Sequence, residues 1–358
     1  MAWKKLSVIL ISFISLALVF QNCSGGTEAN RASNSNNIPT ATGFKAGDTF
    51  DPTVLPYEIN DQAFIDGLNR YMDEFRMDLV KAIAFAADGS GYVAWTSDDR
   101  VGGQEEWDRV VLERCELQNR QACTLFASGN VLVHDEEDFY DSHQSLINLS
   151  PVFDGTQVPG LLTHWRDLLP VNYPPNGQGE FKAYAIGLFG NTHSGWSNAS
   201  DLTTNSQAEA NRRAIEFCEA MSETRLCMLY AIGEQVIFDP INYVLPTQRT
   251  IDYSPGQTFD PSTVPFVRDV SRTDILNRYN AAVSNGESFV LAIDRFGSYD
   301  IATSAGAITD VERNIATTGC KSNVVINPGA FDRECVVYAE NDQVVWDFAT
   351  FRQRALGW

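Results

Sequence analysis

Side chains that could bind a metal ion are concentrated in one short stretch of this 358-residue chain. The stretch consists of His134, Asp135, Glu136, Glu137, Asp138, Asp141 and His143. Carboxylates and imidazoles are ligands for calcium and for transition ions, but the spacing matches neither an EF-hand nor a zinc site. We therefore expect no metal site here and interpret the stretch as a solvated acidic loop.

A serine nucleophile is the second chemistry that the residues suggest. His193 and Ser194 are adjacent, but a catalytic triad needs a base and an orienting group on separate elements, so we interpret the pair as the tip of a hairpin. Metalloprotease, P-loop, nucleophile-elbow and Cys-x-x-Cys motifs do not occur. Since Asp and Glu total 46, close carboxylate pairs arise by chance. We nominate no catalytic residue and expect no cofactor.

The net charge disfavours one class of partner. Lys and Arg total 26 against 46 Asp and Glu, which gives a formal charge of −20 at pH 7. Such a charge repels phosphate backbones, so no nucleic acid partner is expected. The chain is 44% hydrophobic, which is enough for packed cores.

The first 22 residues have the pattern of an export signal. Two lysines precede an apolar run at 6–20, which Gln21 and Asn22 end. The run is shorter than the roughly 20 residues that span a membrane, so 1–22 are predicted to be a signal peptide. Cys23 follows directly, and the polar composition of 23–43 predicts a flexible tether.

This arrangement resembles the start of bacterial lipoproteins, whose signal is cut before a cysteine that receives diacylglycerol on its sulfur. The resemblance implies lipidation at Cys23 and attachment to a membrane through that anchor. Phe20 and Asn22 stand where the family has Leu and a small residue, and the alternatives are an uncleaved anchor or an ordinary cleaved signal. Ser24, in place of the Asp of some retained lipoproteins, favours the outer membrane, on its periplasmic or its surface side.

The rest of the chain contains an internal repeat of about 100 residues. Each copy opens at Phe50, Phe153 or Phe259, so the spacings are 103 and 106. An Ala-rich strand (82–85, 183–186, 290–293) and a glycine turn (Gly89, Gly190, Gly297) come next in each copy. An amphipathic segment follows (105–114, 207–217, 309–319) and ends on a cysteine. A second cysteine begins another strand, and the final strand ends on Asp135, Asp239 or Asp347. A Leu-Asn-Arg-Tyr sequence at 68–71 and 276–279 predicts a lead-in helix in the first and third copies.

Every copy contains two cysteines. The economical pairs are Cys115 with Cys123, Cys218 with Cys227, and Cys320 with Cys335. Each disulfide would contribute about 2 to 3 kcal/mol by constraining the unfolded chain. Disulfides persist in the periplasm, in agreement with the export signal, and pairing disfavours a cysteine metal site and thiol chemistry.

Strand pairs with short turns and one covering helix predict an α+β fold. We expect three tandem repeats, at 44–140, 141–246 and 247–358, each an antiparallel sheet of two hairpins packed on a helix with one disulfide. A single pseudo-threefold body is the alternative.

The repeat resembles small exported bacterial domains of unknown function, a likeness that implies no catalytic residue. Aromatic residues at shared positions are expected in the core (Phe126, Tyr230, Tyr338), whereas Trp95 and Trp196 are either core residues or exposed stacking platforms.

From the Ala-rich strand onward, the shared positions are aromatic, small, glycine or cysteine, with only the terminal Asp charged. We therefore expect a membrane-anchored, non-enzymatic binding or scaffolding protein of the cell envelope, with an envelope protein or a glycan as its partner. Repetition suits multivalent contact. The alternative is an exported hydrolase with a site in the second repeat or at a repeat junction, where the acidic stretch and His164 could converge.

Overall fold

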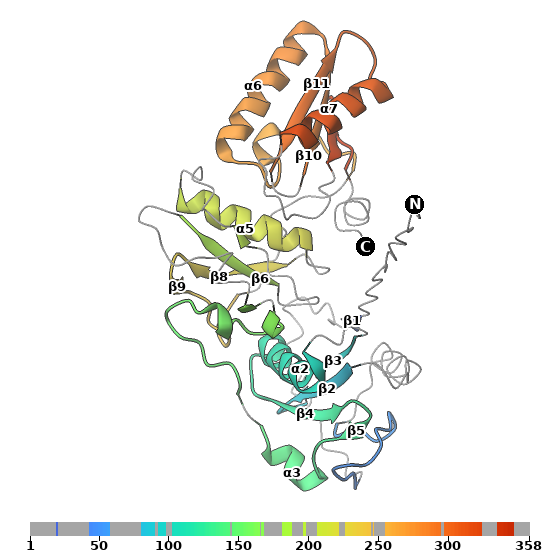
Figure 1. Cartoon of the computed structure of the whole chain (residues 1–358), viewed down its shortest axis with the longest axis vertical. Helices are drawn as coiled ribbons and strands as arrows, with labels where there is room; N and C mark the ends of the chain where they lie inside the picture. Colours follow the sequence, from blue (N-terminus) through green and yellow to red (C-terminus); the bar gives the residue numbers. More distant parts are fainter. Residues whose placement is uncertain are drawn as a thin grey trace, which may run out of the picture.

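The computed structural model confirms an α+β protein with antiparallel sheets and three disulfides. It describes residues 19–20, 43–57, 80–89, 92–97, 102–143, 145–164, 166–167, 181–187, 196–197, 206–221, 226–244, 246, 255–294, 297–323 and 335–346. Three sheets follow one another along the long axis of the molecule (Figure 1). Within the described residues, no helix has the length and apolarity required to span a membrane.

The strands belong to three sheets. The first contains β1 (Val19–Phe20), β2 (Val80–Ala86), β3 (Tyr92–Ser97), β4 (Cys123–Ser128) and β5 (Val131–Leu132); the second β6 (Ala183–Gly187), β7 (Trp196–Ser197), β8 (Cys227–Ile232) and β9 (Gln235–Val236); the third β10 (Ser288–Ile293), β11 (Tyr299–Ser304), β12 (Val336–Glu340) and β13 (Gln343–Val344). The helices are α2 (Gly103–Asn119), α3 (Glu136–Asp141), α5 (Gln207–Met221), α6 (Asp269–Asn285) and α7 (Asp310–Ser322), with short 3₁₀ turns η2 (Gly155–Gln157) and η3 (Pro261–Thr263).

The strand order is the same in each sheet. It is β3-β2-β4-β5 in the first, β7-β6-β8-β9 in the second and β11-β10-β12-β13 in the third. In each central pair the register shifts at one place, after Ile83, Tyr184 or Leu291. β1 adds a fifth strand outside β3; since it lies in the predicted signal peptide, cleavage before Cys23 would leave the same four-strand order in all three.

The turn between the last two strands of each sheet contains a residue with positive φ. These residues are Gly129 (φ 60°), Gly233 (φ 57°) and Asn341 (φ 52°). Glycine and asparagine are the residues that adopt this conformation most readily. The amide of each one donates to the first residue of the central strand or its neighbour, at Lys81, Lys182 and Phe289. The turn chemistry therefore fixes the same hairpin three times.

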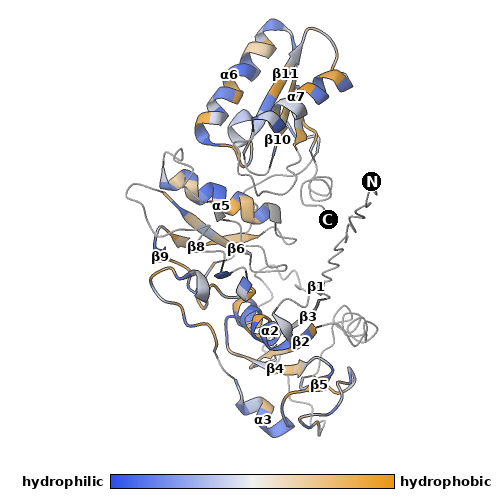
Figure 2. Ribbon diagram, in the orientation of Figure 1, coloured by the Kyte–Doolittle hydropathy of each residue, from blue (hydrophilic) through white to orange (hydrophobic). Residues whose placement is uncertain are grey.

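Each sheet has one face of small residues and one face of aromatic residues. Ala82, Ala84 and Ala86 of β2 are fully buried beneath α2, which small side chains allow to lie close to the strand. The opposite face of the same strand contributes Ile83 and Phe85 to an aromatic cluster. The predicted core aromatics are confirmed, since Phe126, Tyr230 and Tyr338 are all buried. Figure 2 shows that hydrophilic and hydrophobic residues alternate along α5, α6 and α7.

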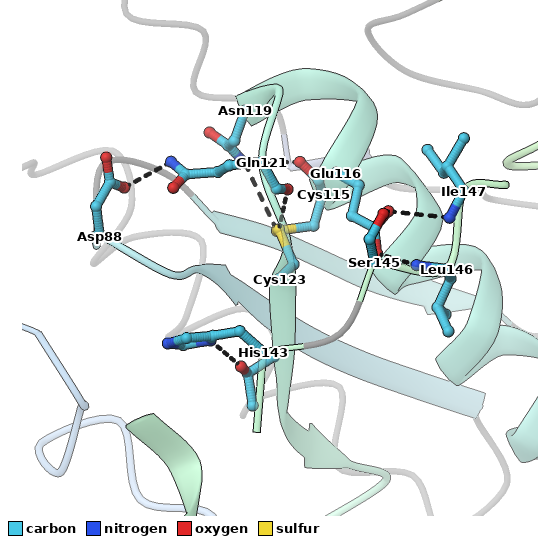
Figure 3. The surroundings of a disulfide bond; sticks show 11 residues. Asp88, Cys115, Glu116, Asn119, Gln121, Cys123, His143, Ser145, Leu146 and Ile147 are labelled. Carbon is cyan, nitrogen blue, oxygen red and sulfur yellow. Dashed lines mark hydrogen bonds between the residues drawn. A yellow bond between two sulfur atoms is a disulfide. The ribbon is translucent and has the colours of Figure 1, made fainter. Parts of the chain in front are cut away.

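The disulfides join each covering helix to a central strand. They link Cys115 to Cys123, Cys218 to Cys227 and Cys320 to Cys335, which are the pairs expected from the sequence. Figure 3 shows the first of them between α2 and β4. The prediction that the helix ends on its cysteine was wrong, because α2, α5 and α7 continue to Asn119, Met221 and Ser322. No proline or glycine follows these cysteines within the helices to stop them.

The segment before each sheet contains the Phe-Asp pair that opens each predicted repeat. The Asp carboxylates of Asp51, Asp154 and Asp260 each accept hydrogen bonds from the backbone and hydroxyl of the residue two positions later, at 2.7 to 2.9 Å. Phe50 and Phe259 are buried and contact Phe126 and Tyr338. The predicted lead-in helix of the third repeat is α6; that of the first lies outside the described residues.

Candidate functional site

Two surfaces connect consecutive sheets, and both are built on a covering helix. We call the contacts between α2 and residues 160–166 the first joint, and those between α5 and residues 266–272 the second joint. Both segments lie just after a Val-Pro pair in the stretch that leads into the next sheet. The joints are therefore contacts between one sheet's helix and the next sheet's lead-in segment.

The first joint is centred on the carboxylate of Glu113, whose side chain is 8% exposed. The Arg109 guanidinium donates to it at 2.7 Å from the preceding turn of α2. The guanidinium of Arg166 donates at 2.8 Å and the backbone amide of Gly160 at 2.6 Å, both from the other side of the joint. A second nitrogen of Arg109 donates to the carbonyl of Leu161 at 2.8 Å. The negative charge of this buried carboxylate is therefore balanced by groups on α2 and by groups on the following segment.

The second joint has the same construction around Glu216, whose side chain is 3% exposed. Arg212 donates to its carboxylate at 2.8 Å, Arg272 at 3.0 Å and the amide of Phe266 at 2.8 Å. Arg212 also donates to the carbonyl of Val267 at 2.9 Å. Burial lowers the pKa of Arg272, which the negative charge of Glu216 opposes.

The two joints correspond residue by residue. Arg109 and Arg212 each stand six positions before the helix cysteine (115 − 109 and 218 − 212), and the glutamates stand two before it. Gly160 and Phe266 occupy the same place in the lead-in segment, and both have positive φ, 74° and 66°. This backbone conformation turns the amide toward the glutamate in both joints.

α7 of the third sheet lacks these charged residues. Asn314 and Thr318 stand six and two positions before Cys320, and both are exposed. Val311 and Ile315 on the same helix are 63% and 52% exposed. At the other end of the chain, Ala63 stands where the later segments have Arg166 and Arg272.

The C-terminal end of α2 makes further contacts with the chain that leads to the second sheet. Glu116 accepts hydrogen bonds from the amides of Leu146 and Ile147 at 2.7 and 3.1 Å, and Figure 3 shows its carboxylate directed at this segment. Burial raises the pKa of Glu116 despite these hydrogen bonds. Tyr243, beyond the second sheet, donates to the carbonyl of Leu117 at 2.6 Å, and Arg120 lies over its ring.

Two ionisable groups at the first joint have shifted pKa values. Arg114 is buried and donates to the carbonyl of Gly160 at 3.1 Å; burial lowers its pKa to about 9. Burial acts to raise the pKa of Glu106, but hydrogen bonds from Thr163 outweigh it and the pKa is lowered. The joint thus stabilises charged Glu106 and disfavours charge on Arg114.

The expectation that the acidic stretch is solvated is confirmed, because four of its five acidic residues are exposed, but the expectation that it is a loop was wrong. Residues 136–141 form the short helix α3, and two of the carboxylates hold the backbone at the start of the first sheet. Asp135 accepts from the amide of Ala46 at 2.8 Å and Glu136 from that of Gly43 at 2.6 Å. Across the part of the chain that the structure describes, no three His, Cys, Asp or Glu side chains are grouped as metal ligands.

The two histidines of this stretch lie beside the ring of Phe139. Nδ1 of His143 lies 2.5 Å from the hydroxyl of buried Thr124, and Nδ1 of His134 lies 3.5 Å from that of Ser142. Burial lowers the pKa of both. The predicted convergence with His164 does not occur, because His164 lies near Glu106 at the first joint and α3 lies on the opposite side of the first sheet (Figure 1).

Several candidate residues from the sequence lie in parts of the chain that the structure does not describe. Cys23, His193 and Ser194 are outside the described residues, as are the side chains of Trp95 and Trp196. Sequence reasoning missed the Arg-Glu pairs of α2 and α5. Their identical offset from the helix cysteine in two copies, and its loss in the third, was a visible signal.

Comparison with protein-family models, with curated proteins and with solved structures found no match for this chain. The class of the protein is therefore defined by its fold and by the contacts at the two joints. It is an α+β protein whose disulfide-linked helices present buried Arg-Glu pairs to the following segment of the chain.

Proposed function

We propose that this chain is an exported, lipid-anchored bacterial protein in which three copies of one α+β unit form an array that acts as a non-enzymatic scaffold or binding protein of the cell envelope. The units are 44–140, 141–246 and 247–358, and the anchor is Cys23. The partner is another envelope protein or a glycan, and the outer membrane is the proposed location.

The observation that carries this proposal is that the charged residues of α2 and α5 bind the protein's own chain at the joints. Glu113 and Glu216, with their arginines, are among the buried or half-buried ionic groups that an enzyme could use for acid-base chemistry. In both joints they bind backbone and side chains of the following segment. A site whose charges are satisfied by the protein itself supports a role in fixing geometry.

The tandem arrangement is supported by details that recur at equivalent positions. An isolated bridge pairs the lead-in segment with the last strand of each sheet, through Thr49, Val152 and Thr258. The central register shift and the positive-φ turn also occur in each sheet. Independent folds have no reason to share such particulars, whereas copies of one unit do.

The start of the first sheet is suited to receive a tether. The amides of Gly43, Ala46 and Gly47 all donate to acceptors in the first unit, at Glu136, Asp135 and the carbonyl of Leu132. Phe44 is buried between Phe126 and Phe139. The proposed tether at 23–43 therefore ends at a segment that is packed against the first unit, as expected for a protein that is held at a membrane by its N-terminus.

A non-reducing peptide mass map of membrane-purified protein tests the anchor. We expect a lipid-modified N-terminal peptide beginning at Cys23, and we expect Cys23→Ala to leave the protein out of the membrane fraction. An unmodified Cys23 peptide in membrane-bound wild-type protein would overturn the lipid anchor.

In-cell cross-linking tests the scaffold role against the alternative of an exported hydrolase. A scaffold with fixed spacing should lose its cross-linked partners when Glu216→Ala opens the second joint, whereas Thr318→Ala, the matched position of α7, should retain them. Unchanged cross-links in Glu216→Ala, or a hydrolytic activity abolished by one substitution outside the joints, would contradict the scaffold.

A further inference from the structure

We propose that the outward face of α7 is the contact surface of a homodimer, in which two copies of this chain pack their α7 helices antiparallel about a two-fold axis. The face consists of five exposed residues, Val311, Asn314, Ile315, Thr318 and Ser322, and we call it the α7 face. Figure 1 shows the third sheet and α7 at one end of the molecule. The partner is a second copy of the chain, and this contact does not depend on the lipid anchor of the proposed function.

The α7 face corresponds to the helix surfaces that form the two joints. Besides its Arg-Glu pair, each joint uses a glutamate nine positions before the helix cysteine. Glu106 accepts a hydrogen bond from the amide of Thr163, and Glu209 accepts one from that of Asp269 at 3.3 Å. α2 and α5 therefore cover this surface with another segment of the chain, whereas α7 leaves it exposed.

The residues of α7 at the joint positions are uncharged. Val311, Asn314 and Thr318 stand nine, six and two positions before Cys320, where both joints have Glu, Arg and Glu. Val311 is 63% and Ile315 52% exposed. A helix surface that contacts only water is typically charged or polar, and exposed apolar residues grouped on one face mark an interaction site. The α7 face is therefore suited to a neutral partner surface and unsuited to the arginines that the lead-in segments contribute to the joints.

A second copy of the α7 face supplies a surface of matching charge. Asp310 and Lys321 are both exposed, and their separation of 11 residues, about three helical turns, places them on the same side of the face. In an antiparallel pair, Asp310 of each copy meets Lys321 of the other, whereas parallel helices would bring like charges together. Asp310 also pairs with Arg313 at 2.9 Å, but its side chain is 99% exposed and accessible to a second cation.

The apolar residues lie at the centre of the same arrangement. The midpoint between Asp310 and Lys321 falls at residues 315–316, so Ile315 lies beside the two-fold axis and contacts its own counterpart, with Val311 next to it. Such an interface is isologous and closes at two subunits. One helix pair buries less area than the roughly 1,200 to 2,000 Å² of stable complexes, so we expect a weak dimer, with a Kd in the micromolar to millimolar range.

Sedimentation velocity of the purified full chain, over a series from about 1 μM to about 1 mM, tests the dimer. We expect a concentration-dependent change from monomer to dimer. Ile315→Asp should weaken the dimer by about tenfold or more, because it buries a carboxylate beside its own copy. Val283→Asp is the matched control, since Val283 is an aliphatic residue of α6 that is 59% exposed and lies outside the α7 face.

Charge reversal tests the antiparallel arrangement separately. Lys321→Asp should weaken the dimer about tenfold, because it removes two symmetric ion pairs and places like charges opposite Asp310. Asp310→Lys combined with Lys321→Asp should restore most of the affinity by forming the same pairs with reversed signs. An equal weakening in the single and the combined variant would overturn the antiparallel arrangement.

Three outcomes overturn the dimer itself. They are a monomer at every concentration, which would leave the α7 face to a different partner, assemblies larger than two subunits, and a dimer that Ile315→Asp and Val283→Asp affect equally. Far-UV circular dichroism identifies a variant that has not folded, and the charge-reversal variants then supply the deciding measurement.

Discussion

Replacing Glu216 with alanine should open the second joint at a calculable cost. The carboxylate is 3% exposed and accepts hydrogen bonds from two guanidinium groups and from the amide of Phe266. Removing one member of a buried ion pair leaves its partners uncompensated and costs about 3 to 5 kcal/mol. Arg212 and Arg272 retain 18% and 16% exposure, so water can solvate them in part. We therefore expect the lower end, about 3 kcal/mol.

Native-state hydrogen exchange is the suitable assay, because three linked units need not unfold in one transition. A loss of about 3 kcal/mol corresponds to roughly 10²-fold faster exchange of the Phe266 amide through joint opening. Amides of the central strand β6 should change little, since the disulfide and the core of the second sheet are untouched.

The third unit supplies the matched control. Thr318 occupies the same helix position as Glu216 and is exposed, so Thr318→Ala should change stability by no more than about 0.5 kcal/mol. If Glu216→Ala and Thr318→Ala gave the same exchange rates, the glutamate would not hold the joint and the reasoning would be refuted.

Three further predictions concern the units themselves. Replacing Cys218 and Cys227 with alanine should lower the free energy of unfolding of the second unit by about 2 to 3 kcal/mol in urea titrations; equal midpoints with the native protein would contradict this. Burial raises the pKa of Tyr140 to about 12 from its ordinary 10.0, so folded protein holds this proton more tightly and stability should fall from pH 10 to 12. Tyr140→Phe should flatten that fall in unfolding curves measured across the range, and an unchanged slope would argue against it. Gly89→Ala should unfold the first unit at lower temperature, because Gly89 has φ 70° and a Cβ there would lie 2.5 Å from the ring of Tyr57; an unaltered thermal midpoint would exclude that contact.

The sequence predicts the interior of each sheet well because the relevant signals are local. Alternation of alanine with larger residues in 82–85 indicates a strand with one small face, and the buried alanines beneath α2 confirm it. The aromatic residue three places after each strand cysteine lies in the core as expected. These patterns depend on neighbours within a few residues, which a single sequence displays.

The joints could not be derived in the same way, because their partners are about 50 residues apart. Glu113 and Arg166 are charged residues of ordinary spacing, and nothing local indicates that they are buried against one another. The acidic stretch shows the same limit. Its composition correctly indicates solvation, but it does not reveal that Asp135 and Glu136 bind the amides of a segment about 90 residues earlier in the chain. Amino-acid composition therefore does not show which charged groups pair with distant parts of the chain.

The distribution of the joint residues has a consequence for how such a protein could grow. The second unit alone has both halves of the joint, Arg166 to dock onto a preceding helix and the Arg212-Glu216 pair to receive a following segment. In the proposed array, a gene that duplicated the middle unit would gain a unit with complete ionic contacts on both sides. Duplicating the first or third copy would instead bring Ala63 or the neutral face of α7 to the new junction. In the proposed array, the number of units can therefore change by duplication of the middle unit more readily than by duplication of either end unit.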